Sequence, residues 1–80
     1  MNVDLDAQTF IRKIDIKQYK NVDECIKQFE RYMESIRKYY ETLESRDEVI
    51  DYNKMLLADF DKRVQFYKNL IKKEWDNGQL

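Results

Sequence analysis

The feature of this sequence that most restricts its fold is a pair of apolar seams with helical spacing. Apolar residues recur at alternating steps of four and three, the repeat of an α-helix that buries one stripe of its surface. The first seam comprises Val22, Ile26, Phe29, Met33, Ile36, Tyr40 and Leu43. The second comprises Ile50, Asn53, Leu57, Phe60, Val64, Tyr67 and Ile71, with Asn53 as its polar member. The spacing therefore predicts two long amphipathic helices.

Capping residues predict where these helices begin and end. Asn21 stands immediately before the first seam and Glu24 follows three positions later, which is the pattern of a capping box. Gly78 follows the second seam and can adopt the left-handed conformation that closes a last turn. We expect the first helix over about residues 22–44 and the second over about residues 46–76.

Two arrangements of the seams are compatible with their repeat. The seven-residue spacing continues unbroken from Val22 to Ile71, so a single coiled-coil rod about 75 Å long is one alternative. Against the single rod, the position four residues after each member of this seven-residue repeat is apolar before residue 45 and charged after it. Near that point Ser45 and Glu48 form another capping-box pattern. We therefore predict an antiparallel helical hairpin that turns near residues 44–46.

The first twenty residues predict a short N-terminal arm. A capped helix beginning near Asp6 places Phe10, Ile11 and Ile14 on one face, whereas Ile14 and Ile16 alternate as in a strand. We expect a short helix followed by an extended linker, with the apolar residues of the arm packed across the open end of the hairpin.

The length of the chain favours one small domain that associates with a second copy. A hairpin within a chain of 80 residues buries too little surface to be more than marginally stable. We expect a single helical domain over residues 1–80, with the arm over 1–20 and the hairpin over 21–77. Self-association would then form a homodimeric helical bundle.

Charge composition describes a solvated surface with no strong field. Charged residues make up 39% of the chain, yet the net charge is −1, which argues against a nucleic-acid binder. Basic clusters near aromatic residues nevertheless keep a nucleic-acid-binding regulatory protein as an alternative. Such a protein would place on one continuous face the basic residues Arg12, Lys13, Lys17, Lys20, Arg37 and Lys38.

The side chains that usually carry catalysis are scarce. The chain contains no His, and Cys25 is its single Cys, so the sequence predicts no catalytic residues, no cofactor and no metal site. Acidic pairs such as Glu30 with Glu34 fit a solvated charged face, on which Asp59 can pair with Arg63 at i,i+4. We interpret Cys25 as a small, half-buried filler and the protein as a non-enzyme.

Targeting signals are also missing from the sequence. Residues 1–10 lack the cationic start and apolar centre of a signal peptide, and no apolar run is long enough to span a membrane. The sequence is rich in Lys, Ile, Asp and Tyr and poor in Ala, Gly and Pro, as in proteins of AT-rich genomes. We expect a cytoplasmic protein of a low-GC bacterium, phage or mobile element, located in the host cytoplasm if phage-encoded.

Aromatic residues are in surplus, with six Tyr, four Phe and one Trp. Those beside or off the seams exceed what a two-helix hairpin can cover, and aromatic side chains are enriched in protein interfaces. The interface candidates are Tyr32, Tyr39, Tyr52, Phe66 and Trp75. The alternative is that these residues close the hairpin's own groove. We interpret the protein as a non-enzymatic protein–protein interaction module, a small regulator, inhibitor or assembly factor whose partners are itself and another protein.

Overall fold

The computed structural model describes residues 3–43 and 59–80, which form three α-helices and a short 3-10 turn. The helices are α1 (Val3–Arg12), α2 (Val22–Leu43) and α4 (Phe60–Asp76), and the turn η1 (Ile16–Gln18) lies between α1 and α2. These two stretches contain no β-strand, which confirms the prediction of an all-α protein. The predicted turn near residues 44–46 and the second-seam residues Ile50, Asn53 and Leu57 lie outside the described residues. The second helix, expected over residues 46–76, does not run unbroken through residue 59, because Asp59 is the N-cap residue from which α4 begins.

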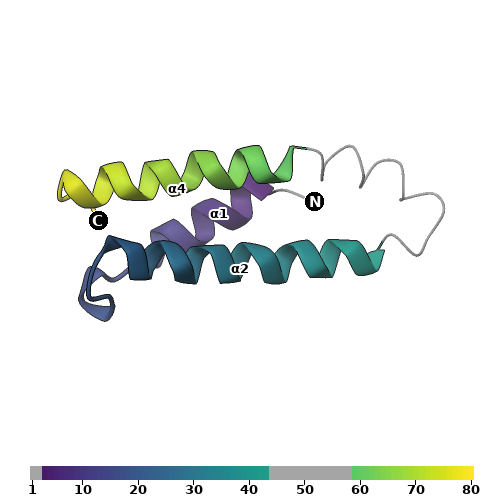
Figure 1. Cartoon of the computed structure of the whole chain (residues 1–80), viewed down its shortest axis with the longest axis horizontal. Helices are drawn as coiled ribbons and strands as arrows, with labels where there is room; N and C mark the ends of the chain where they lie inside the picture. The colour runs from purple at the N-terminus through teal and green to yellow at the C-terminus, as the bar shows by residue number, and fades with distance from the viewer. Residues whose placement is uncertain (1–2, 44–58) are drawn as a thin grey trace.

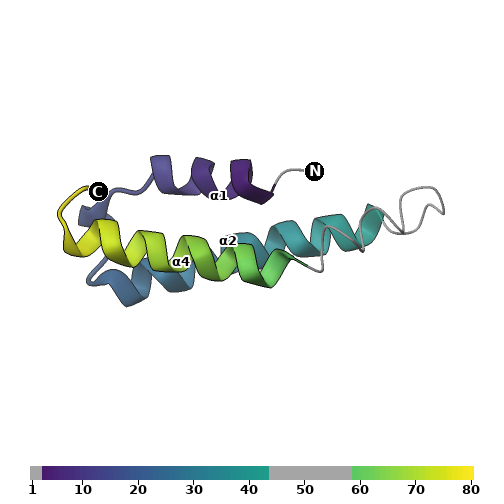
Figure 2. The ribbon, with the colours of Figure 1, turned by 90° about the horizontal axis from the view of Figure 1, so that it is seen from above.

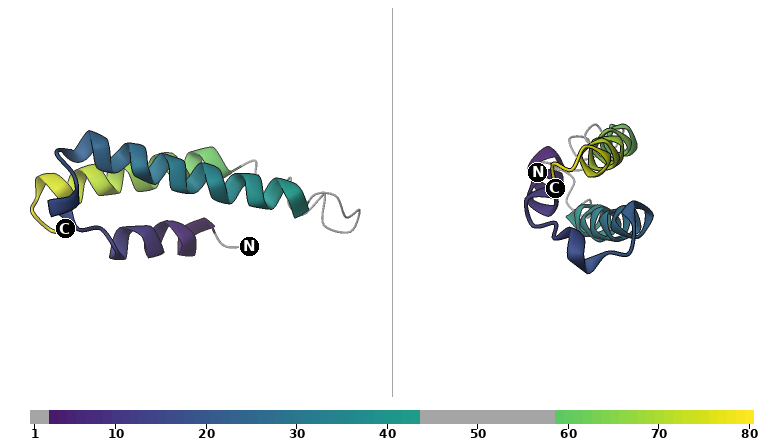
Figure 3. Two further views of the ribbon diagram at one scale, coloured as in Figure 1. Left: turned by 90° about the horizontal axis from the view of Figure 1, so that it is seen from below. Right: turned by 90° about the vertical axis from the view of Figure 1, so that its left-hand side faces the viewer.

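The three helices pack on one another in two layers. Figure 1 shows α2 and α4 side by side and running in opposite directions. In Figure 2, α1 forms a second layer against them. The end-on view in Figure 3 places the helices at the corners of a triangle, with α1 over the groove between α2 and α4. Each helix therefore contacts both of the others.

The position of α1 corrects the expected arm in two respects. The helix begins at Val3 rather than near Asp6, and Val3 and Ala7 are both buried. Asp4 and Asp6 in the first turn complement the positive end of the helix dipole, which favours the earlier start. The helix also lies along the groove rather than across the open end of the two long helices, because the small, fully buried Ala7 allows close approach.

The segment between α1 and α2 contains a 3-10 turn where the sequence suggested an extended linker. The side chain of Asp15 accepts a hydrogen bond from the backbone N–H of Lys17 at 3.0 Å. The backbone carbonyl of Asp15 accepts another from the N–H of Gln18 at 2.9 Å. Such Asx turns stabilise a bend locally. Ile16 is exposed in this turn, so the alternation of Ile14 and Ile16 does not form a strand.

Both predicted caps are present at the ends of the long helices. The Asn21 side chain accepts a hydrogen bond from the N–H of Glu24 at 2.9 Å, which fixes the start of α2 at Val22. The Glu24 carboxylate accepts from the N–H of Lys20 at 3.2 Å, one residue earlier than in a standard capping box.

The end of α4 follows the prediction for Gly78. Its φ is +68°, and its N–H donates to the carbonyl of Trp75 at 3.1 Å. The N–H of Gln79 donates to the carbonyl of Glu74 at 2.8 Å, which completes a Schellman motif. Glycine is favoured here because this φ strains residues with a side chain.

The core lies where the three helices meet. Phe29 of α2 is fully buried, and the ring of Phe10 from α1 packs edge-on against it with the ring centroids 5.3 Å apart. Val22, Ile26, Ile36 and Val64 of the seams are half-buried against this cluster, and the side chains of Tyr40 and Leu43 lie outside the described residues. The buried residues are Val3, Ala7, Cys25, Phe29, Met33, Phe60, Tyr67 and Ile71.

Two ion pairs at the rim of the core fix the register of α2 against α4. Lys68 Nζ lies 2.9 Å from Glu30 Oε1, and Arg37 lies 3.3 Å from Asp61 Oδ1. The second pair is seven residues further along α2 and seven residues back along α4, as antiparallel packing requires. The sign of the charge on α2 reverses between the two pairs. A shift of α4 by one heptad would therefore bring like charges together.

Replacing Phe29 with Ala should remove the centre of the core. We expect the free energy of unfolding to fall by about 3–5 kcal/mol, because a buried Phe loses both its transfer free energy and its packing contacts. Urea denaturation measures this change, with Gln28→Ala on the exposed face of α2 as the control. Equal stability of the two variants would show that Phe29 is not enclosed by the helices.

Reversing charges should test the register of α2 and α4. Glu30→Lys and Lys68→Glu each bring like charges together and should lower stability, whereas the double variant restores an opposite pair. Because both side chains are partly exposed, we expect a coupling free energy of about 0.5 kcal/mol in a double-mutant cycle. Strictly additive effects would contradict the contact.

Candidate interaction surface

The structure separates the aromatic interface candidates into two groups. Tyr32 is half-buried, with its ring centroid 5.3 Å from that of Phe10, and Trp75 is half-buried against the core. Tyr39 and Phe66 are each 62% exposed, and Tyr52 lies outside the described residues. Part of the aromatic surplus is therefore packed within the chain, because α1 lies along the two long helices and its Phe10 contacts Tyr32.

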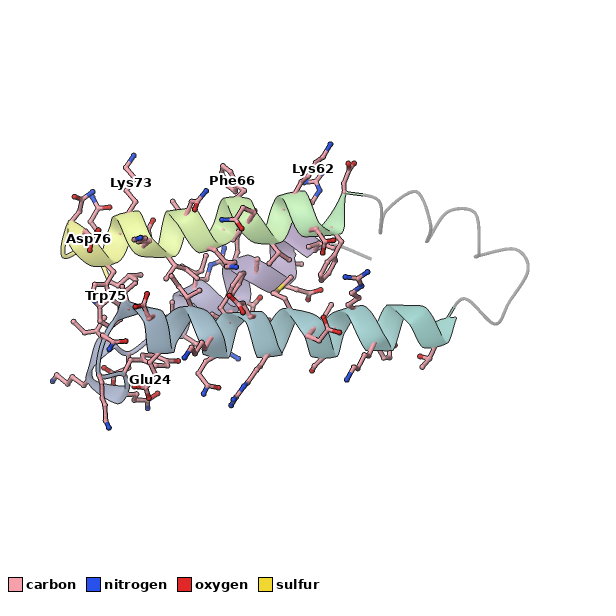
Figure 4. The ribbon with its side chains drawn as sticks, viewed as in Figure 1. Glu24, Lys62, Phe66, Lys73, Trp75 and Asp76 are labelled. Carbon is pink, nitrogen blue, oxygen red and sulfur yellow. The ribbon has the colours of Figure 1, made fainter. Side chains whose placement is uncertain are left out.

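Phe66 projects from the side of α4 that faces away from α2. Figure 4 shows Lys62, Phe66 and Lys73 pointing away from α2, whereas Trp75 points towards the beginning of that helix. The ring of Phe66 packs edge-on against the buried Tyr67, with centroids 5.1 Å apart and an interplanar angle of 89°. This contact joins the exposed ring to a buried neighbour.

We call the surface formed by Lys62, Phe66, Asn69 and Lys73 the α4 outer face. Steps of four, three and four place these residues on one stripe of the helix. Their stripe is offset from the apolar seam, so the helix buries one stripe and presents another. The aromatic surplus pointed to Phe66 but not to the three polar members, although their helical spacing in the sequence was a signal for this stripe.

Two shallow, open hollows meet at Phe66. The first lies towards α1 and is lined by Asp4, Asp59, Lys62, Arg63 and Phe66. The second lies further along α4, where Phe66 is joined by Asn69, Leu70 and Lys73. A ring that stands between two hollows offers contact on both of its sides.

Charged side chains of α4 that lie beside α1 or α2 form ion pairs, whereas the lysines of the α4 outer face form none with the described residues. Asp61 and Lys68 pair with α2, and Arg63 pairs with α1. Within residues 3–43 and 59–80, Lys62, Lys72 and Lys73 have no ion-pair partner within 4.0 Å. The unpaired charges between Lys62 and Lys73 on α4 are therefore all positive.

Asp4 anchors α1 beside the α4 outer face. One of its carboxylate oxygens accepts a hydrogen bond from Arg63 at 2.6 Å, and the other accepts from the Tyr67 hydroxyl at 3.0 Å. The i,i+4 spacing predicted that Arg63 pairs with Asp59, whereas its guanidinium reaches Asp4 near the other end of the chain. The cluster joins α1 to α4 at the edge of the first hollow.

Burial raises the pKa of the Tyr67 hydroxyl above its ordinary value of 10.0. A hydrogen bond from Gln8 opposes this shift, and the Asp4 carboxylate adds to it because a negative neighbour disfavours the phenolate. Burial likewise raises the pKa of Tyr19, with smaller contributions from Cys25, Asp15 and Glu24.

Residues considered for chemistry take structural positions in the described stretches. Cys25 is fully buried, more than the half-burial expected, and burial raises the pKa of its thiol above 9.0. Glu30 pairs with Lys68 across the helices. In the part of the chain that the structure describes, no cluster of three or more Cys, Asp or Glu side chains has the geometry of a metal site.

Comparisons with models of known protein families, with curated proteins and with solved structures found no match to the chain. Among the described helices, none combines the length and the apolar character needed to cross a membrane.

Alkaline pH should destabilise the fold through the buried Cys25 thiol and the hydroxyls of the buried Tyr67 and the half-buried Tyr19. The pKa values of Cys25, Tyr19 and Tyr67 are raised on folding, so the unfolded chain releases these protons first as the pH rises. Their contribution to stability is complete below pH 9 and declines above it.

Urea denaturation between pH 8 and pH 11 measures this decline. Tyr67→Phe should be less stable at pH 8, because it lacks the hydrogen bond to Asp4, and should show a shallower loss at higher pH. A wild-type stability that does not change up to pH 11 would contradict the burial of these groups.

Proposed function

We propose that this chain is a non-enzymatic protein–protein interaction module, acting as a small regulator, inhibitor or assembly factor. The observation that carries the proposal is the exposed ring of Phe66 at the centre of the α4 outer face. The three packed helices supply a support that holds this face in one orientation.

An exposed apolar residue is common on protein surfaces and is by itself weak support for an interface. Phe66 differs because Tyr67 supports its ring, hollows lie on both sides and Lys62 and Lys73 flank it along the helix. An aromatic anchor surrounded by polar residues is the arrangement found at the centre of many protein interfaces.

We also propose that α2 and α4 belong to one helical hairpin, in agreement with their antiparallel packing. A homodimer is a second proposal. Because α1 adds buried surface within one copy, stability depends less on contact with a second copy. A two-helix hairpin leaves its seam open to a second copy on either side, whereas α1 covers one of these sides here. Light scattering at two protein concentrations distinguishes a dimer from a monomer of 9.9 kDa.

Nucleic-acid binding has less support from the arrangement of basic residues. Arg12, Lys13, Lys17 and Lys20 lie near the start of α2, whereas Arg37 is about 22 Å further along that helix. Arg37 is also engaged by Asp61 and lies over the Phe60 ring, 5.8 Å from its centroid. The six basic residues thus fall into two separate groups, and one member of the second group, Arg37, already forms contacts within the fold.

Photo-crosslinking in the cells that encode the protein tests the interaction directly. Benzoylphenylalanine at position 66 keeps the phenyl ring and adds a benzoyl group, for which the exposed site has room, and the same group at Gln28 on the exposed face of α2 is the control. We expect a discrete adduct with another protein from position 66 and none from position 28. No adduct from position 66, or the same adducts from both positions, would contradict the proposal.

A further inference from the structure

We infer that the α4 outer face binds an acidic amphipathic helix of a partner protein, which places an apolar side chain against Phe66 and carboxylates near Lys62 and Lys73. The inference rests on the proposed function and names the chemistry of the partner.

The centre of the face determines the apolar part of the partner. Phe66 is 62% exposed, and the half-buried Leu70 lines the hollow beside it. A Leu, Ile or Phe side chain entering either hollow would cover the ring and remove apolar surface of both molecules from water. A purely polar ligand would leave the ring exposed and gain nothing from it.

The ends of the face determine the charge of the partner. Lys62 and Lys73 lie about 16 Å apart along α4, and the ion pairs of α4 leave both of them available. A partner helix packed along α4 reaches both ammonium groups with carboxylates about three turns apart, on either side of its apolar residue. Lys72 beside Lys73 adds a further positive charge at that end.

A second copy of this chain satisfies the α4 outer face less completely than an acidic helix does. A two-fold axis through Phe66 and perpendicular to α4 would place Lys62 of one copy opposite Leu70 of the other and Lys73 opposite Asp59, so only one of the two lysines would meet a carboxylate. An acidic helix from a different protein can place carboxylates near both lysines.

A nucleic acid fits the face less well than an acidic helix. Asp59 and Asp76 lie just beyond the two ends of the lysine stripe and would repel a polyanion that continues past it. A helix of three to four turns ends within these limits. Its apolar side chain also uses Phe66, which phosphate contacts do not require.

Selection from a displayed library of random peptides on the full-length protein tests the inference. We expect enriched peptides that combine Asp or Glu with Leu, Ile or Phe at helical spacing. The synthetic form of the best peptide should bind at least tenfold more weakly to Phe66→Ala and to the double variant Lys62→Glu/Lys73→Glu. The control Lys27→Glu/Lys38→Glu makes the same charge change on α2 and should keep the affinity within about twofold.

Thermal denaturation of each variant confirms that it is folded before binding is compared, since all of these positions are exposed. No enrichment, enrichment of basic peptides, or unchanged binding to the Lys62→Glu/Lys73→Glu variant would overturn the inference. Tighter binding of a 20-base-pair DNA duplex than of the peptide would also overturn it.

The two proposals fail in different ways. An adduct from position 66 together with insensitivity to the lysine reversal would preserve the interaction function and refute the acidic partner. Absence of any adduct from position 66 would refute both.

Discussion

The contact between Phe10 of α1 and Phe29 of α2 closes a core that two helices alone would leave open. An antiparallel pair buries the seam between its helices but exposes that seam along the groove on either side. In this protein α1 lies over one groove, and its buried Val3 and Ala7 bring the helix close enough for Phe10 to reach Phe29. The chain thereby forms a three-helix core from one copy.

Electrostatic interactions at the rim of this core determine which charges remain for other molecules. Asp4 engages Arg63, Glu30 engages Lys68 and Arg37 engages Asp61, so each pair joins two different helices. These surface pairs contribute little free energy individually. Their larger consequence is that they specify register and leave lysines on the outward side of α4. The proposed interaction surface is thus a product of how the core is assembled.

The features of the fold that depend on local chemistry could be predicted from the sequence. The spacing of apolar residues predicted the helices. Asn21 and Gly78 marked helix ends correctly, because a cap is formed by residues only a few positions apart. The start and the position of the N-terminal helix were predicted wrongly, since the burial of Val3 depends on a groove formed by residues far along the chain. The partner of Arg63 was missed for the same reason, because Asp4 becomes a neighbour only after α1 docks. The exposure of Phe66 and the partial burial of Trp75 likewise depend on tertiary packing, which helical periodicity alone does not determine.

Native-state hydrogen exchange of the α1 amides tests most directly whether this helix belongs to the core. If α1 completes the core, the amides of Phe10, Ile11 and Arg12 should exchange only through the global unfolding that exposes the amides of α2 and α4. Their opening free energies should then match that of Phe29 and respond equally to urea. Exchange of the α1 amides at rates near those of an unfolded peptide, with α2 and α4 still protected, would contradict a three-helix core.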